Sequence, residues 1–263
     1  MAEKAKTNRF RLSLDQISAL VSKDFKLKYN STALGFFWSL LVPALTSVVY
    51  YFVFGIMLRF NAEHYLLYLM SGTFLWQFFS SVVMMNGSVL TSNAGLLKKT
   101  SFNRELLVWG TFFTESIHFF LTIPVLLIMM FCYGIVPHVS ALPNFVIVFL
   151  ALLMLAVGLS YAYAAANLFF RDLERIMTIV MMMWMFASPV FIPVSTVANS
   201  APQYLWVYKV NPMAQILGLW RDIFYQPAFN PGTYLQVLAL GFAVLVVGRW
   251  IFRKMEPGFA EMM

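Results

Sequence analysis

Residues 33–58 form an apolar stretch that contains no Asp, Glu, Lys, Arg or His. As a helix, this stretch is about long enough to cross the hydrocarbon core of a bilayer, which is roughly 30 Å thick. Gly35 and Pro43 lie early in it and weaken or bend a helix, which a membrane span tolerates when neighbouring groups bind the freed carbonyls. A basic segment, Lys23–Tyr29, comes shortly before it. The stretch therefore predicts a first membrane span that follows a charged arm, with the chain turning into the bilayer near Gly35 and Pro43.

The composition places the whole chain in the membrane class. Hydrophobic residues make up 61% of it, charged residues 11%, and its mean hydropathy is +0.76, whereas soluble domains carry about 25% charged residues. The net charge of +7 could suggest a nucleic-acid partner. The basic residues cluster instead at the ends of apolar stretches, where they contact anionic lipid and set topology, so we expect membrane lipid and no nucleic acid as a partner. The single cysteine, Cys132, excludes an internal disulfide, and the polar N-terminus predicts no cleavable signal peptide.

Five further apolar stretches follow the first, and together they predict an all-α protein with six transmembrane helices. They are residues 65–90, 106–133, 145–170, 176–194 and 235–252. An even number of spans puts both termini on one side, and 15 of the 18 Lys and Arg residues fall on that side. Because short basic segments stay in the cytoplasm, both termini are predicted to be cytoplasmic. The predicted organisation is a cytoplasmic arm at 1–32, a six-span domain at 33–258 and a cytoplasmic tail at 259–263.

The arm is predicted to contain an amphipathic helix over residues 12–28. Leu14, Ile17, Val21 and Phe25 have the spacing of one helical stripe, with polar and basic residues on the remaining face. A short basic amphipathic helix beside a span most often lies flat in the headgroup region. Two roles stay open: the helix anchors the chain, or it guides an anionic lipid-linked substrate or touches a partner.

Residues 204–225, between the fifth and sixth predicted spans, are apolar and aromatic but are interrupted by Asn211-Pro212. This break and the charge pattern argue against a seventh crossing. We therefore expect a re-entrant or interfacial helical hairpin on the outer face. Its aromatic rings suit the membrane interface, and binding of sugar rings is the alternative. They belong to Trp206, Tyr208, Trp220 and Tyr225.

Glu115 and His118 are an ionisable pair predicted to lie inside a span. Three residues apart, they share a helix face, and intramembrane ionisable groups are functional candidates. One interpretation is a structural hydrogen-bonded pair, because buried polar groups need partners. The other is a proton relay in a secondary transporter, although the internal repeat that such folds often have is not visible.

Enzymatic chemistry finds little support in the sequence. A membrane glycosyl- or acyltransferase would need a cluster of carboxylates or histidines at a membrane face, and neither a catalytic set nor a metal site is predicted. The chain contains no Gly-Lys dipeptide and hence no phosphate-binding P-loop. We therefore expect no cofactor in this chain, and any energy that drives the protein is expected to come from elsewhere.

Two predicted cytoplasmic segments, 95–105 and 167–175, interleave Phe and Leu with charged residues. Ordinary topogenic charge is one interpretation. The other is a docking knob that fits an apolar pocket of a partner.

Five motifs occur in a characteristic order along the chain. They are Leu34–Pro43, Lys98-Lys99 to Arg104-Glu105, Asn167–Asp172, Ser188-Pro189-Val190 and Asn211-Pro212. Together they resemble the transmembrane subunit of type-2 ABC polysaccharide exporters, the Wzm group that exports lipid-linked O-antigen. The resemblance extends from about residue 23 to residue 260. One departure is Asn103, where the family usually has Pro before the arginine, and it affects the shape of that turn.

The resemblance implies a non-enzymatic permease in the bacterial inner membrane, a homodimer that works with two copies of an ATPase subunit. Its substrate would be a polysaccharide on an undecaprenyl diphosphate carrier, moved to the periplasm through an aromatic-lined channel at the dimer interface. The arm would be an interfacial helix, the second-to-third loop a coupling helix, and the fifth-to-sixth connection a pair of re-entrant gate helices. Capsule polysaccharide and teichoic acid export are close alternatives.

The resemblance and the residue chemistry together assign candidate roles. Coupling to the ATPase is predicted for Lys98, Lys99, Phe102, Arg104 and Glu105. The diphosphate headgroup is predicted to meet Lys23, Lys26, Lys28 and Arg171. Contacts to the apolar C–H faces of sugars are predicted for Phe36, Phe37, Trp38 and Tyr50. Gating movement is expected at the bend formed by Gly35 and Pro43.

Overall fold

The computed structural model describes residues 2–29, 37–59, 63–97, 102–136, 142–225, 231–260 and 262. Every regular element in these ranges is a helix, which confirms the predicted all-α class. The elements are α1 (Ala2–Tyr29), α2 (Trp38–Tyr50), the π-helix η2 (Tyr51–Met57), α3 (Tyr65–Gly87), α4 (Val89–Ser92), α5 (Ala94–Leu97), α6 (Glu105–Cys132), α7 (Leu142–Phe169), α8 (Leu173–Phe186), α9 (Val194–Ser200), η4 (Pro202–Tyr204), α10 (Leu205–Val210), α11 (Pro212–Tyr225), α12 (Pro231–Met255) and η5 (Glu256–Ala260).

Five of the described helices are long and apolar enough to cross a membrane, so the chain is a multi-pass membrane protein. They are Trp38–Met57, Tyr65–Gly87, Glu105–Cys132, Leu142–Phe169 and Pro231–Phe259. These helices correspond to the first, second, third, fourth and sixth predicted spans.

The fifth predicted span, 176–194, has a different structure. Helix α8 has 14 residues, and at about 1.5 Å per residue its length of roughly 21 Å falls short of the hydrocarbon core. The chain from 187 to 193 is non-helical and contains Pro189 and Pro193. Prolines end helices because they lack a backbone donor and push the preceding residue out of the helical region. The count of six spans therefore stays a prediction.

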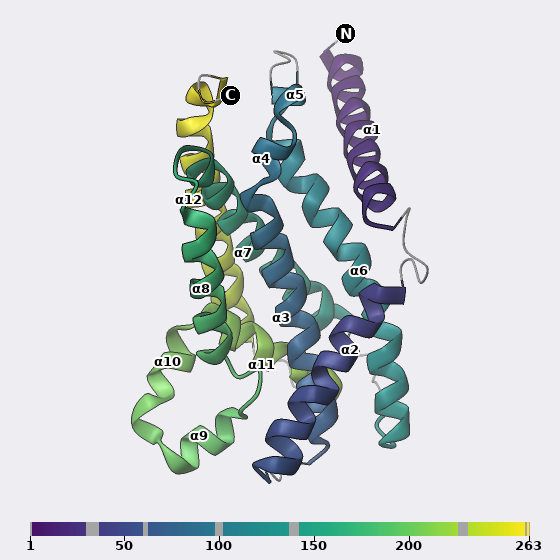
Figure 1. Cartoon of the computed structure of the whole chain (residues 1–263), viewed down its shortest axis with the longest axis vertical. Helices are drawn as coiled ribbons and strands as arrows, with labels where there is room; N and C mark the ends of the chain where they lie inside the picture. Colours follow the sequence, from purple (N-terminus) through teal and green to yellow (C-terminus); the bar gives the residue numbers. More distant parts are fainter. Residues whose placement is uncertain are drawn as a thin grey trace.

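The two ends of the chain lie at the same end of the helix bundle, together with α4 and α5 (Figure 1). Helix α8 begins at that end and runs towards the end that carries α9 and α10 (Figure 1). When α8 is included, the described helices therefore pass along the bundle an even number of times. The basic C-terminal turn of α12, with Arg253 and Lys254, lies at the same end as the arm.

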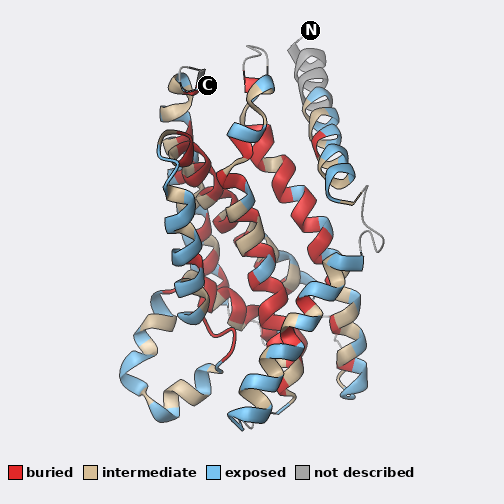
Figure 2. Ribbon diagram, viewed as in Figure 1, coloured by how far each residue is buried: buried red, intermediate tan, exposed pale blue. Residues whose placement is uncertain are grey.

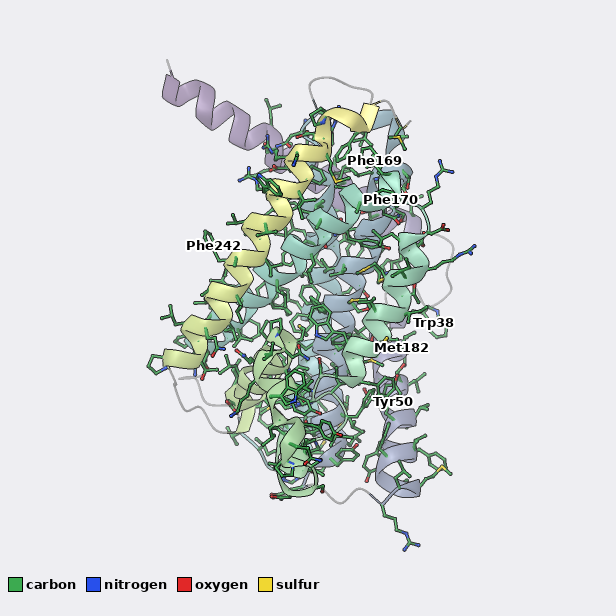
Figure 3. The ribbon with its side chains drawn as sticks, turned by 90° about the vertical axis from the view of Figure 1, so that its left-hand side faces the viewer. Trp38, Tyr50, Phe169, Phe170, Met182 and Phe242 are labelled. Carbon is green, nitrogen blue, oxygen red and sulfur yellow. The ribbon has the colours of Figure 1, made fainter. Side chains whose placement is uncertain are left out.

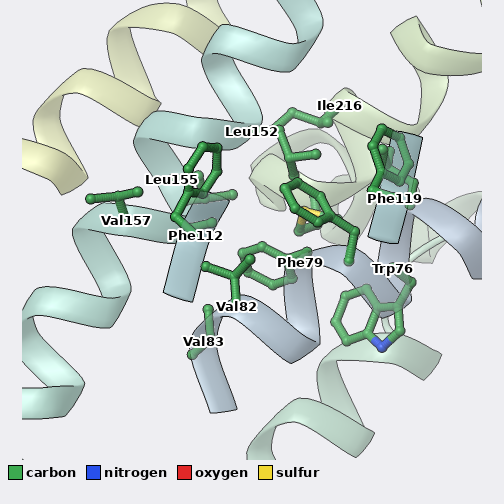
Figure 4. Close-up of a cluster of buried hydrophobic side chains, with 14 of the residues drawn as sticks. Trp76, Phe79, Val82, Val83, Phe112, Phe119, Leu152, Leu155, Val157 and Ile216 are labelled. Carbon is green, nitrogen blue, oxygen red and sulfur yellow. The ribbon is translucent and has the colours of Figure 1, made fainter. Parts of the chain in front are cut away.

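Helices α3, α6 and α7 carry most of the buried side chains, whereas α2 and α8 expose much of their surface (Figure 2). In the most apolar part of each helix, 72% of the residues of α3 are buried but only 11% of those of Trp38–Met57. The first span is therefore peripheral and α3 is central. Figure 4 shows side chains of α3, α6, α7 and α11 that meet in the core, among them Phe79, Val82, Phe112, Leu155 and Ile216.

Helices α7 and α12 pack with their backbones in contact. A Cβ on Gly248 would lie 1.8 Å from the carbonyl oxygen of Gly158, and one on Gly241 would lie 2.9 Å from that of Ala151. Membrane helices associate closely where small residues let their backbones approach. These glycines therefore fix α12 against α7.

Residues 205–225 form two helices, α10 and α11, separated by the predicted break. Their arrangement as a re-entrant or interfacial hairpin stays a prediction. The break falls at Asn211, whose ψ of 112° is extended, and Pro212 begins the second helix. Trp220 on α11 is buried in the core and donates from Nε1 to the carbonyl oxygen of Ser71 at 3.1 Å. The interface position predicted for Trp220 is therefore wrong, because its ring packs among Phe119, Phe145 and Phe224 instead. Trp206 on α10 is exposed.

The helix predicted in the arm is present as α1, and it begins earlier, at Ala2. Its C-terminal half packs on α6, where Leu20 is buried against Gly110. Lys23 Nζ also donates to Asn93 Oδ1 at 2.6 Å, which ties the arm to the α4–α5 segment. A flat position in the headgroup region stays a prediction.

Candidate functional site

Four polar side chains from the arm and α6 meet in one cluster. Lys28 Nζ donates to Glu115 Oε1 at 3.3 Å and lies 3.4 Å from His118 Nδ1. The Tyr29 hydroxyl lies 2.8 Å from His118 Nε2, and Glu115 Oε1 lies 3.4 Å from His118 Nδ1. Glu115 and His118 are buried, and a buried carboxylate needs a compensating charge and hydrogen bonds. We name Lys28, Tyr29, Glu115 and His118 the charged cluster.

The charged cluster joins two groups of residues that the sequence had assigned separately. Lys28 was expected to meet a diphosphate headgroup, and Glu115 with His118 was expected to form an isolated intramembrane pair. The structure places them together, so the Glu115 carboxylate compensates the Lys28 ammonium. Burial, with a smaller contribution from the Glu115 carboxylate, raises the pKa of the Tyr29 phenol above its ordinary value. Tyr29 is therefore a neutral partner of the His118 ring at pH 7.

A cavity of about 360 Å³ opens beside the charged cluster, between α1, α2, α3 and α6. The cluster supplies its charged wall. Aromatic rings from three helices supply its apolar wall, namely Trp38, Phe74, Phe78 and Phe119. Uncharged polar groups line the remainder, namely Ser39, Gln77, Ser81 and Thr122. The cavity therefore combines one compensated ion pair with rings and neutral hydrogen-bonding groups.

A second cavity, of about 310 Å³, lies further along α2 and α3 and reaches α8. Its lining includes Thr46 and Tyr50 of α2, Trp76 of α3 and Met185 of α8. Both cavities are lined by Gln77 and Ser81 of α3. The two cavities therefore adjoin along one edge of α3.

The predicted channel aromatics divide between these cavities and the surface. Trp38 lines the first cavity and Tyr50 the second. Trp38 begins α2 and Tyr50 ends it, and both lie at the margin of the molecule in Figure 3. Phe37 is exposed and lines neither cavity, and Phe36 lies outside the described residues.

The predicted headgroup residues are not brought together within one chain. Lys23 is bound to Asn93 and Lys28 belongs to the charged cluster. Lys26 and Arg171 are exposed. Helix α1 and the start of α8, which Arg171 precedes, lie on opposite sides of the bundle (Figures 1 and 3).

The predicted coupling residues meet the C-terminal helix. Glu105 Oε1 accepts from Arg249 Nε at 3.0 Å and also from Arg253 Nε. Arg104 Nη1 donates to the carbonyl oxygen of Glu256 at 2.9 Å. Phe102 packs against the core, whereas Lys98 and Lys99 lie outside the described residues. The start of α6 is therefore bound to the end of α12.

Sequence reasoning missed the C-terminal partners of this network. Arg249 and Arg253 were counted only as topogenic charges. Their spacing of four residues was a usable signal, because it places both guanidinium groups on one helix face. Only the fold, however, brings Glu105 to that face.

The structure gives a physical reason for the motifs Ser188-Pro189 and Asn211-Pro212. Asn211 Oδ1 accepts from Trp184 Nε1 at 2.8 Å and from the Met213 amide at 3.0 Å. Asn211 Nδ2 donates to the Ala187 carbonyl at 3.0 Å and lies 2.9 Å from Ser188 Oγ. One amide side chain therefore caps α11 and holds it to the end of α8.

Arg221 also holds α11 in place, and the sequence did not predict this role. It is one of the three Lys and Arg residues that the charge count left outside the cytoplasmic side, yet it is buried and stacks 3.5 Å from the centre of the Tyr68 ring. Its Nη1 donates to the Pro189 carbonyl at 2.6 Å and to the Tyr68 hydroxyl at 2.8 Å. Arg221 therefore ties α11 to α3 and to the non-helical segment after α8.

The fold and the site together define a helical membrane protein with adjoining intramembrane cavities and a docked basic arm. The model of the ABC-2 type transporter family matches residues 15–225, from the arm to the end of α11. The chain belongs to the ABC-2 type transporter family, whose members are membrane permease components of ABC exporters.

Individual relatives match over almost their whole length. The O-antigen export system permease protein RfbA of Klebsiella pneumoniae is 32% identical over 250 residues, which cover 95% of each chain. The protein of the same name from Myxococcus xanthus is 32% identical over 249 residues, which cover 92% of this chain and 93% of that one. The polysialic acid transport protein KpsM of Escherichia coli is 19% identical over 251 residues, which cover 94% and 96%. The resemblance to polysaccharide-export permeases that the motifs indicated is confirmed.

Proposed function

We propose that this chain is the membrane-spanning subunit of an ATP-driven exporter that moves undecaprenyl-diphosphate-linked O-antigen across the bacterial inner membrane to the periplasm. The observation that carries the proposal is the identity of 32% to permeases named for O-antigen export, over 95% of the chain. The site agrees with it, because the cavities pair aromatic rings with neutral hydrogen-bonding groups. Such linings suit sugars, which have hydroxyl edges and apolar C–H faces.

The active assembly is a homodimer with two ATPase subunits, and ATP and Mg²⁺ bind to those subunits. The absence of a P-loop motif from the sequence supports a separate ATPase. The peripheral first span supports a partner in the membrane, because α2 exposes Leu45, Val48 and Val49 on the side away from the core. The second copy covers part of this face, and the glycan passes between the two copies.

The subunit crosses the membrane six times, with both termini in the cytoplasm. The position of both termini at one end of the bundle supports an even number of crossings (Figure 1). The fifth of these crossings is made by α8 and the non-helical segment after it, and α10 and α11 re-enter from the periplasmic side. Non-helical backbone at that depth must bind protein groups, and Asn211 and Arg221 bind the carbonyls of Ala187, Pro189 and Val190.

The start of α6 transmits the ATPase stroke. Lys98 and Lys99 bind the ATPase. Phe102, Arg104 and Glu105 pass the movement to α12, the last two through the network with Arg249, Arg253 and Glu256. The contacts of Glu105 support this route, because they join the predicted coupling loop to the C-terminal helix. Replacement of Glu105 by Gln is expected to leave ATP hydrolysis intact and to reduce export per ATP consumed.

We assign the diphosphate headgroup to a smaller set of residues than the sequence suggested. Lys28 is compensated by Glu115 and holds the arm to α6, so it is a poor diphosphate ligand within this subunit. Lys26 and Arg171 are exposed and remain the better candidates. In a homodimer, the arm of one copy and the α7–α8 turn of the other form the two sides of that site.

Capsule polysaccharide is the second candidate substrate. Its support is the relationship to the polysialic acid transport protein, which is weaker at 19% identity. A proton-coupled transporter that uses Glu115 and His118 has less support, because both side chains are engaged by Lys28 and Tyr29.

The proposal is tested by deleting the gene in its native host and supplying it on a plasmid. We expect the deletion to remove polymeric O-antigen from the cell surface while lipid-linked polymer accumulates inside. The plasmid copy should restore export, and restoration should fail when the ATPase subunit lacks its P-loop lysine. Normal surface O-antigen with loss of capsule would favour the second candidate. Export that persists without ATP hydrolysis would contradict the proposal.

A further inference from the structure

Helix α3 is a mostly apolar span with a row of polar side chains along one edge. Thr73, Gln77 and Ser81 follow one another at intervals of four residues, so they lie on one side of the helix. Thr73 has partners, because its Oγ1 donates to the Leu69 carbonyl at 2.8 Å and lies 2.8 Å from Ser47 Oγ. Gln77 is exposed and has no hydrogen-bond partner among the described residues. An amide in the middle of a span that lacks protein partners needs water or a ligand, because hydrocarbon offers it none.

Gln77 lies where the two cavities adjoin, and it lines both of them together with Ser81. Rings flank it on each side, with Trp38 in the first cavity and Tyr50 and Trp76 in the second. Its amide offers two donors and one acceptor, which can pair with sugar hydroxyls in either role. Its environment is therefore a polar contact between two aromatic-lined spaces.

The charges that line the two cavities indicate which part of a lipid-linked glycan can bind beside Gln77. The first cavity contains Lys28 and Glu115 as a compensated pair, and the lining of the second contains no Asp, Glu, Lys or Arg among the described residues. A diphosphate would be recognised by uncompensated cations. An uncharged, polyhydroxylated chain needs none, and neutral hydrogen bonds release it more readily than charge-assisted ones.

We infer that Gln77 is a specificity-determining residue that binds hydroxyl groups of an uncharged glycan as the chain passes along α3, with Ser81 as its neighbour. The inference rests on the proposed function and deepens it by assigning the glycan contact to one edge of α3. The diphosphate is bound elsewhere. Successive sugars exchange hydrogen bonds with the same amide, as transport requires when binding must be favourable but reversible.

The first test compares Gln77→Leu with Gln77→Asn in the complete exporter in cells. The leucine variant is expected to slow export of the O-antigen on the order of tenfold, since about one hydrogen bond per sugar is lost, and the asparagine variant should retain most of the rate. The matched control is Gln236→Leu on α12, an exposed glutamine that lines neither cavity and should export normally. Membrane insertion and ATPase binding should be unchanged in all three variants.

The second test asks whether position 77 faces water. The chain has one cysteine, so Cys132→Ser gives a cysteine-free background. Gln77→Cys in that background should react with a water-soluble cationic methanethiosulfonate, and glycan in transit should slow the reaction. Leu150→Cys on α7, exposed but outside both cavities, should react at least tenfold more slowly when lipid surrounds it.

Two results overturn the inference: normal export by Gln77→Leu, or a cysteine at 77 that reacts no faster than the one at 150. Failure of the proposed function has a different signature, because deletion of the whole gene would then leave O-antigen export unchanged. The two failures are thus distinguishable in the same strains.

Discussion

Helix α12 packs on α7 through backbone contacts, whereas α2 packs on α3 through side chains that leave cavities. Across α7 and α12, glycines bring the backbones of the two helices into contact. Across α2 and α3, polar and aromatic side chains leave two cavities, and α2 buries little of its own surface. Backbone contact resists movement, whereas a cavity-lined contact permits it. The α7–α12 side is therefore a rigid support, and the α2–α3–α8 side is where a substrate finds room and where helices can shift.

The largest loss of stability is expected from a substitution that disrupts the contact between α7 and α12. Gly248→Leu places side-chain atoms into the α7 backbone and should destabilise the subunit by about 3 kcal/mol or more, because neither backbone can yield. Thermal unfolding of the purified subunit in detergent measures the loss. Gly218→Ala is the control, since a Cβ there meets open space and a helical alanine is favoured over glycine. A Gly248→Leu variant as stable as the unmodified subunit would remove the distinction between the two sides.

The second largest loss of stability is expected from substitution of Asn211, which joins α11 to the end of α8. Asn211→Ala removes the cap of α11 and leaves Trp184 Nε1 without its partner, so we expect a loss of about 2–4 kcal/mol. The same unfolding measurement checks it. Asn199→Ala, at an exposed position of α9, should change stability by less than about 0.5 kcal/mol. Equal effects of the two substitutions would contradict the assigned role of Asn211.

The arm contact on the open side should be weaker. Lys28→Ala leaves the buried Glu115 carboxylate with His118 but without its ammonium partner, and since the Lys28 side chain is 42% exposed we expect a loss of only about 1–2 kcal/mol. Addition of Glu115→Gln should recover part of that loss, and the double-mutant cycle measures the coupling. Lys26→Ala is the matched control. A cycle with no coupling energy would mean that the arm is not held by the charged cluster.

Much of this organisation followed from patterns in the sequence alone. The apolar stretches predicted six spans, and five of these are helices long and apolar enough to cross a membrane. The interruption at Asn211-Pro212 predicted the break between α10 and α11. Helix α8 was expected to be longer because the apolar pattern continues through Pro189 and Pro193, where the backbone cannot remain helical. The composition of a stretch shows that it is apolar, but it does not show where a helix within that stretch ends.

The candidate site was less predictable because its parts are distant in sequence. Lys28 and Glu115 are 87 residues apart, and Glu105 and Arg249 are 144 apart. Each residue had been recognised as polar or charged, but its partner depends on the packing of α1 and α12 on α6. Gln77 lies within a predominantly apolar stretch of the sequence, and its importance depends on the two cavities that adjoin beside it.

The most direct test of the account links the two walls of the second cavity. Tyr50→Cys on α2 and Met185→Cys on α8, in the Cys132→Ser background, are joined by a short reducible bis-thiol crosslinker in membranes that contain the complete exporter. Each single cysteine with the same reagent is the control. If this side carries the glycan and moves, export stops when the two helices are linked and resumes when the linker is reduced. Export at the normal rate with α2 and α8 still linked would contradict the account.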